Sequence, residues 1–153
     1  MNKTIRRFGI AGVAALAMLL ASGSTAFAAN QVYPLAFATQ DWGCGTESRS
    51  STVHLVLQCD GNLVLYRNSD NHAMWAAGTD VLPQAPSTLG FSSRGMLWLH
   101  AGDSTACVIV KNVYGGRAVV QDDGNFVVYR ADGTAAWSSG TYNNRQGTVH
   151  ECA

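Results

Sequence analysis

Two nine-residue stretches of this chain share the pattern Q-x-D-G-N-x-V-x-Y, and the second begins 63 positions after the first. Alternate residues of an extended strand lie on one face, so the identical side chains of each stretch can form one patch. Gln, Asn and Tyr side chains donate and accept hydrogen bonds, and an ionised Asp accepts them. A hydroxyl group needs such mixed partners, so the pattern predicts a hydroxyl-rich small molecule that is bound more than once. The candidate binding residues are Gln58, Asp60, Asn62, Val64 and Tyr66 in the first copy, and Gln121, Asp123, Asn125, Val127 and Tyr129 in the second.

A plain β-hairpin is the simplest alternative interpretation of this pattern. An Asp-Gly pair between apolar runs favours a tight turn, because glycine adopts positive φ without steric strain. A hairpin accounts for the glycine and the valine. It does not account for Gln and Tyr at the same places in both copies, so we favour ligand binding over a purely structural role.

Catalysis is not expected at the motif. Asp122 and Asp123 form a carboxylate pair, but glycoside hydrolysis needs two carboxyl groups on either side of the scissile bond. Neighbouring residues of a strand face opposite ways, and nothing in the sequence marks a nucleophile with its base. The sequence predicts a binding protein and not an enzyme.

A second pattern, W-x-x-G-T, begins at Trp42, Trp75 and Trp137. The intervals of 33 and 62 residues indicate that one copy is missing midway, so the chain contains three repeats of about 32 residues. Cys107 falls near the place of the missing tryptophan. We expect the in-phase tryptophans in the core, and we expect Trp98, which breaks the phase, to be an exposed aromatic residue.

The middle repeat aligns with the nine-residue pattern over residues 91–99, with Leu97 at the valine position. In this alignment the polar side chains are gone, so the middle repeat is predicted to be degenerate. The residues at the Gln, Asp, Asn and Tyr positions are Phe91, Ser93, Gly95 and Leu99, respectively. Two binding sites per chain are therefore expected, not three.

Short β-strands are predicted throughout, because no segment after residue 28 shows a convincing helical hydrophobic period. Strands are expected over residues 53–57, 63–66, 74–75, 117–121, 126–129 and 136–137. Three similar hairpin units cannot bury their apolar faces singly, but they can do so when packed around a pseudo-threefold axis. The predicted fold class is all-β.

The first 28 residues are predicted to be a secretory signal peptide. Three basic residues precede an apolar run over 10–21, and a small-x-small cleavage site ends at Ala28, with cleavage after Ala29 as the near alternative. The run is shorter than a typical membrane-spanning helix, and no later segment approaches membrane-spanning length. We expect a secreted, extracellular domain over residues 29–153, about 125 residues long, which is a usual size for one domain.

The charge of the chain argues against polyanionic partners. The leader holds three of the ten basic residues and none of the ten acidic ones, so the remaining formal charge is 7 − 10 = −3. Nucleic acid would call for a basic stripe, and anionic lipid would call for a run of Lys and Arg. We therefore expect no nucleic-acid partner and no membrane insertion.

Four cysteines follow the leader, at Cys44, Cys59, Cys107 and Cys152. An even number in an exported chain favours two disulfides, for which three pairings are possible. We prefer Cys44–Cys59 together with Cys107–Cys152. A zinc site is the alternative, but no C-x-x-C pair occurs and the histidines lack ligand spacing, so no metal or cofactor is expected.

The two patterns together resemble the sugar-binding motif and the repeat ends of the monocot mannose-binding, or bulb-type, lectins. The resemblance extends from about Val32 to Thr141. It implies a type II β-prism with three pseudo-threefold-related four-stranded antiparallel sheets and no metal requirement. It also implies a carbohydrate-binding lectin with specificity for α-D-mannose, and hence mannose-containing glycans as partners.

The resemblance also implies a role for each motif residue. Asp60 and Asn62 hold the axial 2-hydroxyl of mannose, and Gln58 holds the 3-hydroxyl. Tyr66 binds the 4-hydroxyl, while Val64 packs on the ring carbons. The same roles in the second copy fall to Asp123 and Asn125, Gln121, Tyr129 and Val127.

The C-terminal residues echo the first repeat. Gly140-Thr141 matches Gly45-Thr46 at an offset of 95, and residues 148–150 match residues 52–54 at an offset of 96. An offset of three repeats returns to the same position around the pseudo-threefold axis. The two ends of the domain therefore carry similar segments that would fit the same position in the prism. We hypothesise a homodimer formed by exchange of a terminal strand, which a strictly monomeric protein in solution would contradict.

Two other functions are compatible with the sequence. A protein-interaction or antagonistic module, bacteriocin-like or inhibitory, would use the same scaffold and would bind a protein partner regardless of mannose. A hydrolase would cleave chromogenic glycosides. Bacterial lectin-like toxins that resemble this family usually carry two such domains, whereas this chain has room for one.

Overall fold

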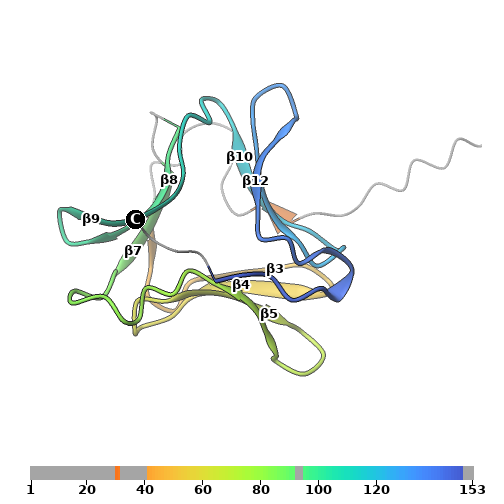
Figure 1. Ribbon diagram of the computed structural model, residues 1–153, viewed down its shortest axis with the longest axis horizontal. Coiled ribbons are helices and arrows are strands. Elements are labelled where there is room, and N and C mark those ends of the chain that lie inside the picture. Colours follow the sequence, from red (N-terminus) through yellow and green to blue (C-terminus); the bar gives the residue numbers. More distant parts are fainter. Residues whose placement is uncertain (1–29, 32–40, 92–94, 150–153) are drawn as a thin grey trace, which may run out of the picture.

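The computed structural model describes residues 30–31, 41–91 and 95–149. These residues form twelve β-strands and one short 3-10 helix, and the strands build three four-stranded antiparallel sheets around a common centre (Figure 1). This arrangement confirms the predicted all-β prism. The predicted leader (residues 1–28) and Cys152 lie outside the described residues. No helix in the described part of the chain is long and apolar enough to cross a membrane.

Each sheet combines three consecutive strands of one repeat with one strand that precedes all the repeats. The first-motif sheet consists of β3 (Glu47–Arg49), β4 (Val53–Leu57), β5 (Leu63–Arg67) and β6 (Ala73–Ala76). The middle sheet consists of β2 (Trp42–Gly43), β7 (Thr88–Phe91), β8 (Leu97–Ala101) and β9 (Ser104–Val110). The second-motif sheet consists of β1 (Asn30–Gln31), β10 (Arg117–Val120), β11 (Phe126–Tyr129) and β12 (Ala135–Ser138), and the helix η1 (Tyr142–Asn144) follows.

The three N-terminal strands join the sheets in the reverse order of the repeats. β3 pairs with β4, β2 pairs with β7 and β1 pairs with β10. A single chain therefore supplies all four strands of every sheet. Exchange of a terminal strand with a second subunit remains a prediction.

The C-terminal segment joins two of the sheets without adding a strand. After β12, residues 141–149 contain η1 and irregular backbone. The Gly147 N–H donates to the Met74 carbonyl of β6 at 2.8 Å, and the Gln146 amide donates to the same carbonyl at 3.0 Å. The segment thus ties the end of the second-motif sheet to an edge of the first-motif sheet. His150, part of the predicted echo, lies outside the described residues.

The inner faces of the sheets meet in one apolar core, and aromatic rings occupy part of it. The rings of Trp75 and Trp137 meet edge to face at 5.4 Å, and Phe126 lies 6.1 and 5.5 Å from them. Such tilted contacts are favourable between aromatic rings and bury a large apolar area. The prediction that the in-phase tryptophans are core residues is confirmed for Trp75, while Trp42 and Trp137 are partly buried and pack against the core.

The predicted alignment of the middle repeat is wrong by one residue. Leu97 and Leu99 do not occupy the valine and tyrosine positions, because both side chains are fully buried in the core. Phe91 pairs with Leu97 just as Leu57 pairs with Leu63, so Phe91 corresponds to Leu57 and not to the motif Gln. Ser93, predicted at the Asp position, lies outside the described residues.

The corrected alignment changes which side chains face outwards. Trp98 takes the valine position and His100 takes the tyrosine position of the motif. Gly95 corresponds to the turn glycine and not to the motif Asn; its φ is +72°, close to the +88° of Gly61. A shift of one residue moves every side chain of a strand to the opposite face. Trp98 therefore lies on the outer face of the sheet, out of phase with the core tryptophans, but it is partly buried and not exposed as predicted.

Cys107 replaces the missing tryptophan. Leu99 pairs with Cys107 in the middle sheet, and Leu65 pairs with Trp75 in the first-motif sheet. Cys107 is 2 % exposed and belongs to the core. The predicted place of this cysteine in the repeat is confirmed.

Candidate functional site

Two tight turns present the nine-residue motifs in the same way. Gly61 and Gly124 have φ values of +88° and +89°, which other residues rarely adopt. Gly61 N–H donates to Gln58 O at 3.0 Å, and Gly124 N–H donates to Gln121 O at 3.1 Å. The Asp-Gly pairs therefore form the predicted turns, and each turn brings the start of its motif alongside the following strand.

The Gln and Tyr of each motif are joined by a hydrogen bond. Gln58 Nε2 donates to Tyr66 Oη at 2.8 Å, and Gln121 Nε2 donates to Tyr129 Oη at 2.6 Å. Each Tyr hydroxyl accepts this bond, so its own proton stays available for another acceptor. The paired side chains form a fixed donor and acceptor set, which a plain hairpin does not need.

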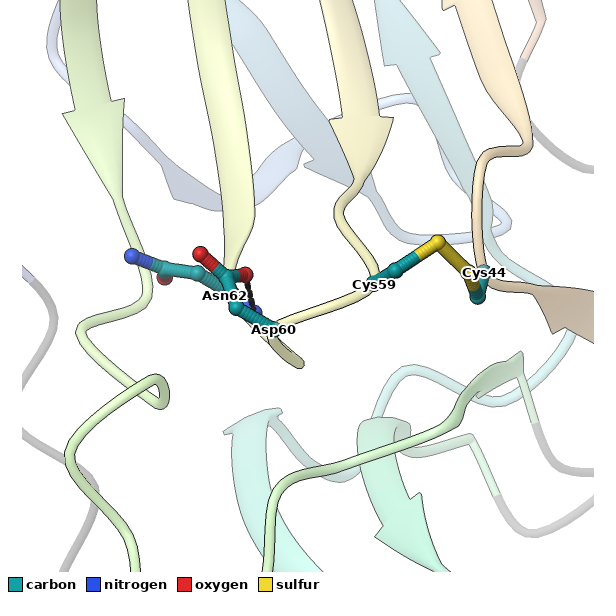
Figure 2. Close-up of a disulfide and its surroundings, with 4 residues drawn as sticks. All are labelled: Cys44, Cys59, Asp60 and Asn62. Carbon is teal, nitrogen blue, oxygen red and sulfur yellow. Dashed lines mark hydrogen bonds between the residues drawn. A yellow bond between two sulfur atoms is a disulfide. The ribbon is translucent and has the colours of Figure 1, made fainter.

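The Asp of each motif caps its own turn. Asp60 Oδ1 accepts the Asn62 backbone N–H at 2.9 Å (Figure 2), and Asp123 Oδ1 accepts the Asn125 N–H at 3.0 Å. The backbone bond fixes the carboxylate and leaves the second oxygen free to accept a bond from a ligand.

The side-chain carbonyl of each motif Asn binds the Gly-Thr end of the W-x-x-G-T pattern. Asn62 Oδ1 accepts the Gly78 N–H at 3.0 Å, and Asn125 Oδ1 accepts the Thr141 N–H at 3.2 Å. Thr79 Oγ1 returns a bond of 2.7 Å to the carbonyl of the turn glycine, and Thr141 Oγ1 does the same at 2.6 Å. Thr79 and Thr141 are fully buried, so they position the motif. This contact explains why the two sequence patterns stay in phase.

Each patch also contains the motif valine and a motif tyrosine whose ring contacts a side chain of the paired strand. Val64 and Val127 are each 3 % exposed, so each offers only a small apolar surface between the polar side chains. His54 stacks on Tyr66 with ring centroids 5.4 Å apart, and the Arg117 guanidinium lies 4.8 Å from the centre of the Tyr129 ring. The sequence reasoning did not identify either supporting residue; both sit directly opposite the motif tyrosine on the paired strand.

A disulfide anchors the first motif beside its turn. Cys44 is bonded to Cys59, as predicted, and Cys59 immediately precedes Asp60 (Figure 2). Cys107 is also disulfide-bonded, while its predicted partner Cys152 lies outside the described residues.

Replacing both Cys44 and Cys59 with Ser is expected to lower the free energy of unfolding by about 3 kcal/mol, because the bond closes a loop of about 15 residues. Urea unfolding under non-reducing conditions measures the change. The Cys107 disulfide stays in both proteins, so the difference reports on this bond alone. An unchanged midpoint would contradict the prediction.

At the equivalent place in the second motif, a hydrogen-bonded carboxylate replaces the disulfide. Asp122 Oδ1 accepts bonds from Ser51 Oγ at 2.7 Å and from Ser51 N–H at 2.8 Å. These bonds, the hydroxyl bond foremost, hold the pKa of Asp122 below its ordinary value of 3.8. A lowered carboxyl pKa stabilises the folded state above the unfolded-state pKa, and this contribution is lost as the pH falls through the folded-state pKa.

Ser51→Ala removes the hydroxyl donor and is expected to raise the pKa of Asp122 towards its ordinary value. An NMR titration of the side-chain carboxyl signals measures the change. Asp132 provides the control, because its pKa is lowered by Thr134 and not by Ser51. Equal shifts at both carboxyls would show that the effect is not local.

The outer face of the middle sheet carries a different set of side chains. The rings of Trp98 and His100 make a tilted contact with centroids 4.2 Å apart, and His100 Nε2 lies 3.7 Å from Asp41 Oδ2. A Cβ at Gly90 would meet atoms of all three side chains at 2.7–2.8 Å, so a larger residue there would have to displace them. The Gln–Tyr pair of the other two sheets has no counterpart among the described residues of this face. Within the described ranges, no group of three or more His, Cys, Asp or Glu side chains is placed to hold a metal ion.

Comparisons with known proteins give matches among solved structures. A scan against protein-family models and a search of the curated proteins found no match. A monomeric monocot mannose-binding lectin from Gastrodia elata shares 31% identity, with 69% of this chain and 94% of that chain covered and a TM-score of 0.60. A lectin from Marasmius oreades shares 22% identity, with 69% and 88% covered and a TM-score of 0.59; this match concerns the fold alone. A domain-swapped lectin dimer from Mycobacterium smegmatis shares 33% identity, with 66% and 93% covered and a TM-score of 0.38.

Proposed function

The chain belongs to the monocot mannose-binding, or bulb-type, lectin family, and from this premise we propose that it is a secreted lectin that binds α-D-mannose at two sites. The sites are the two motif patches, with the hydroxyl-binding roles that the family resemblance implies. The proposed partners are mannose-containing glycans. Lectins of this fold bind sugars without catalysing a reaction, in keeping with the absence of a nucleophile pattern in the sequence.

One observation carries the proposal: the same hydrogen-bonding arrangement is built twice, on two different sheets. In both copies a Gln–Tyr pair and a turn-capping Asp surround one buried valine. Among the described residues, no partner occupies the second carboxylate oxygen or the phenol proton of either copy. Adjacent sugar hydroxyls need acceptors and donors in this mixture, and a carboxylate gives the stronger, charge-assisted bonds.

The expected affinity of one site is modest. A shallow patch with a handful of hydrogen bonds should bind a monosaccharide with a Kd on the order of millimolar, or about −4 kcal/mol. Two sites on one chain, or four in an exchanged dimer, would strengthen binding to a surface that displays many mannose ends. Sizing of the protein in solution tests the dimer, which a strictly monomeric species would exclude.

Retention on a mannose resin tests the proposed function. We expect the protein to be retained, to elute with free methyl α-mannoside, and to be unaffected by a chelator. A glycan array would then identify the preferred mannose linkage. Passage through the resin without retention would refute the proposal, and capture of a protein partner that mannoside does not displace would favour an interaction module.

Secretion is proposed from the leader sequence alone. The apolar run and the cleavage site that ends at Ala28 support export. Fractionation of the producing cells, with N-terminal sequencing of the exported protein, tests this part of the proposal. A protein that stays in the cytoplasm with its leader intact would refute it.

A further inference from the structure

The two motif sites differ at the residue that follows the Gly-Thr end of the W-x-x-G-T pattern, the pair that binds the motif asparagine. This residue is Asp80 beside the first motif and Tyr142 beside the second. Asn62 Nδ2 donates to Asp80 Oδ1 at 2.9 Å. Tyr142 is engaged elsewhere, because its hydroxyl accepts a bond of 2.6 Å from Arg145, whose guanidinium lies 4.6 Å from the centre of its ring.

This difference changes the charge around the motif asparagine. Asn62 binds two carboxylates, Asp60 through its backbone N–H and Asp80 through its side-chain amide. In the described part of the chain, Asn125 binds a single carboxylate, that of Asp123, and its side-chain carbonyl is held by neutral groups. The asparagine of the first site therefore contacts two negative charges, whereas that of the second contacts one.

A neutral hydroxyl is poorly matched to two carboxylates. It has one proton and can donate to one carboxylate oxygen, so a ligand that covers the second oxygen of the other carboxylate leaves that oxygen without a donor, which is unfavourable. A protonated amine has three N–H donors and a positive charge, so it can donate charge-assisted bonds to a carboxylate while the charges of both carboxylates attract it.

We propose that Asp80 makes the first motif site selective for an amino sugar, a hexose with a protonated amine where Asp60 and Asn62 would hold the 2-hydroxyl. The second site, which has Tyr142 at this position, takes the neutral sugar. This inference rests on the proposed function of the motifs as sugar sites and names a ligand class for one of them.

Single-site proteins allow each site to be measured separately. Asp123→Ala leaves the first site and Asp60→Ala leaves the second, and both variants have the same net charge. Calorimetry with mannose, mannosamine and N-acetylmannosamine then compares a neutral ligand, a cationic ligand and a neutral ligand with the same nitrogen. Non-specific attraction of a cation to an acidic protein would affect both variants equally.

We expect the Asp123→Ala protein to bind mannosamine about fivefold more tightly than mannose, since exposed ion pairs each contribute modestly, and to show no such preference for N-acetylmannosamine. Adding Asp80→Asn, which keeps an oxygen to accept the Asn62 bond, should abolish the preference. The Asp60→Ala protein should show none.

Two results would overturn the inference: no mannosamine preference in the Asp123→Ala protein, or a preference that survives Asp80→Asn. If these variants still bind mannose, the proposed lectin function stands and only the role of Asp80 fails. If the unmodified protein binds none of the three sugars, the proposed function fails and the inference fails with it.

Discussion

Replacing Asp60 and Asp123 together with Ala is expected to abolish retention of the protein on a mannose resin. Each carboxylate caps its motif turn through one oxygen, so its other oxygen can accept a bond from a ligand. A hydrogen bond to a charged group contributes about 1.5–3 kcal/mol. A site that supplies only about −4 kcal/mol in total cannot lose that much and still hold a monosaccharide measurably.

The matched control for this double variant is Asp132→Ala. Asp132 caps the turn between β11 and β12, and its Oδ1 accepts the Thr134 N–H at 2.8 Å. The substitution removes the same kind of turn bond outside the motif patches, so retention should persist. If the double variant keeps its melting temperature and still binds the resin, the assignment of the sites to the motifs is refuted.

The number of sugars bound per chain tests the assignment of each site separately. Calorimetry should count two sugars per unmodified chain and one per chain for each single Asp variant. Resin binding by the single variants should be weaker than that of the unmodified protein, because only one site per chain remains for multivalent attachment. A third bound sugar would mean that the middle sheet is also a binding surface.

The parts of the fold that depend on local sequence were predictable. The turns at Gly61 and Gly124 follow from the need for positive φ, which an Asp-Gly pair marks. The strands around them follow from aliphatic runs of the right length, and the predicted strand over 126–129 coincides with β11. The position of Trp75 in the core and of Trp137 against it followed from their regular recurrence.

The middle repeat was aligned wrongly because its polar markers are absent. Leu97 and Leu99 alternate like the outward-facing Val and Tyr of the motif, so aliphatic spacing alone did not fix the register. The residue that could have fixed the alignment was Gly95, which has positive φ and corresponds to the turn glycine Gly61. Aligning the two glycines would have placed Trp98 and the two leucines on their correct faces.

Contacts between distant segments lay beyond sequence reasoning. The bond from Ser51 to Asp122 joins the first repeat to the last, and the bond from Asn62 to Asp80 crosses from a turn to a following loop. Neither pair has a periodicity or a spacing that marks it. These contacts arise only when the sheets have closed around the common core, and they make the two motif sites different.

Replacing Trp75 with Ala is expected to lower the free energy of unfolding by about 3–5 kcal/mol, the usual range for truncation of a large buried aromatic residue. Trp75 is 3 % exposed and contacts Trp137 and Phe126, which come from the second-motif sheet. Its loss opens a cavity where two sheets meet. Urea unfolding followed by circular dichroism measures the change.

Trp98→Ala is the matched control, because it removes the same side chain from the outer face of the middle sheet. Trp98 contacts the His100 ring at a tilt and is only partly buried, so its loss should lower the free energy of unfolding by about 1 kcal/mol. The corrected alignment requires this difference: had Leu97 taken the outer valine position, Trp98 would have pointed into the core. Equal destabilisation by the two substitutions would therefore contradict both the alignment and the assignment of Trp75 to the core.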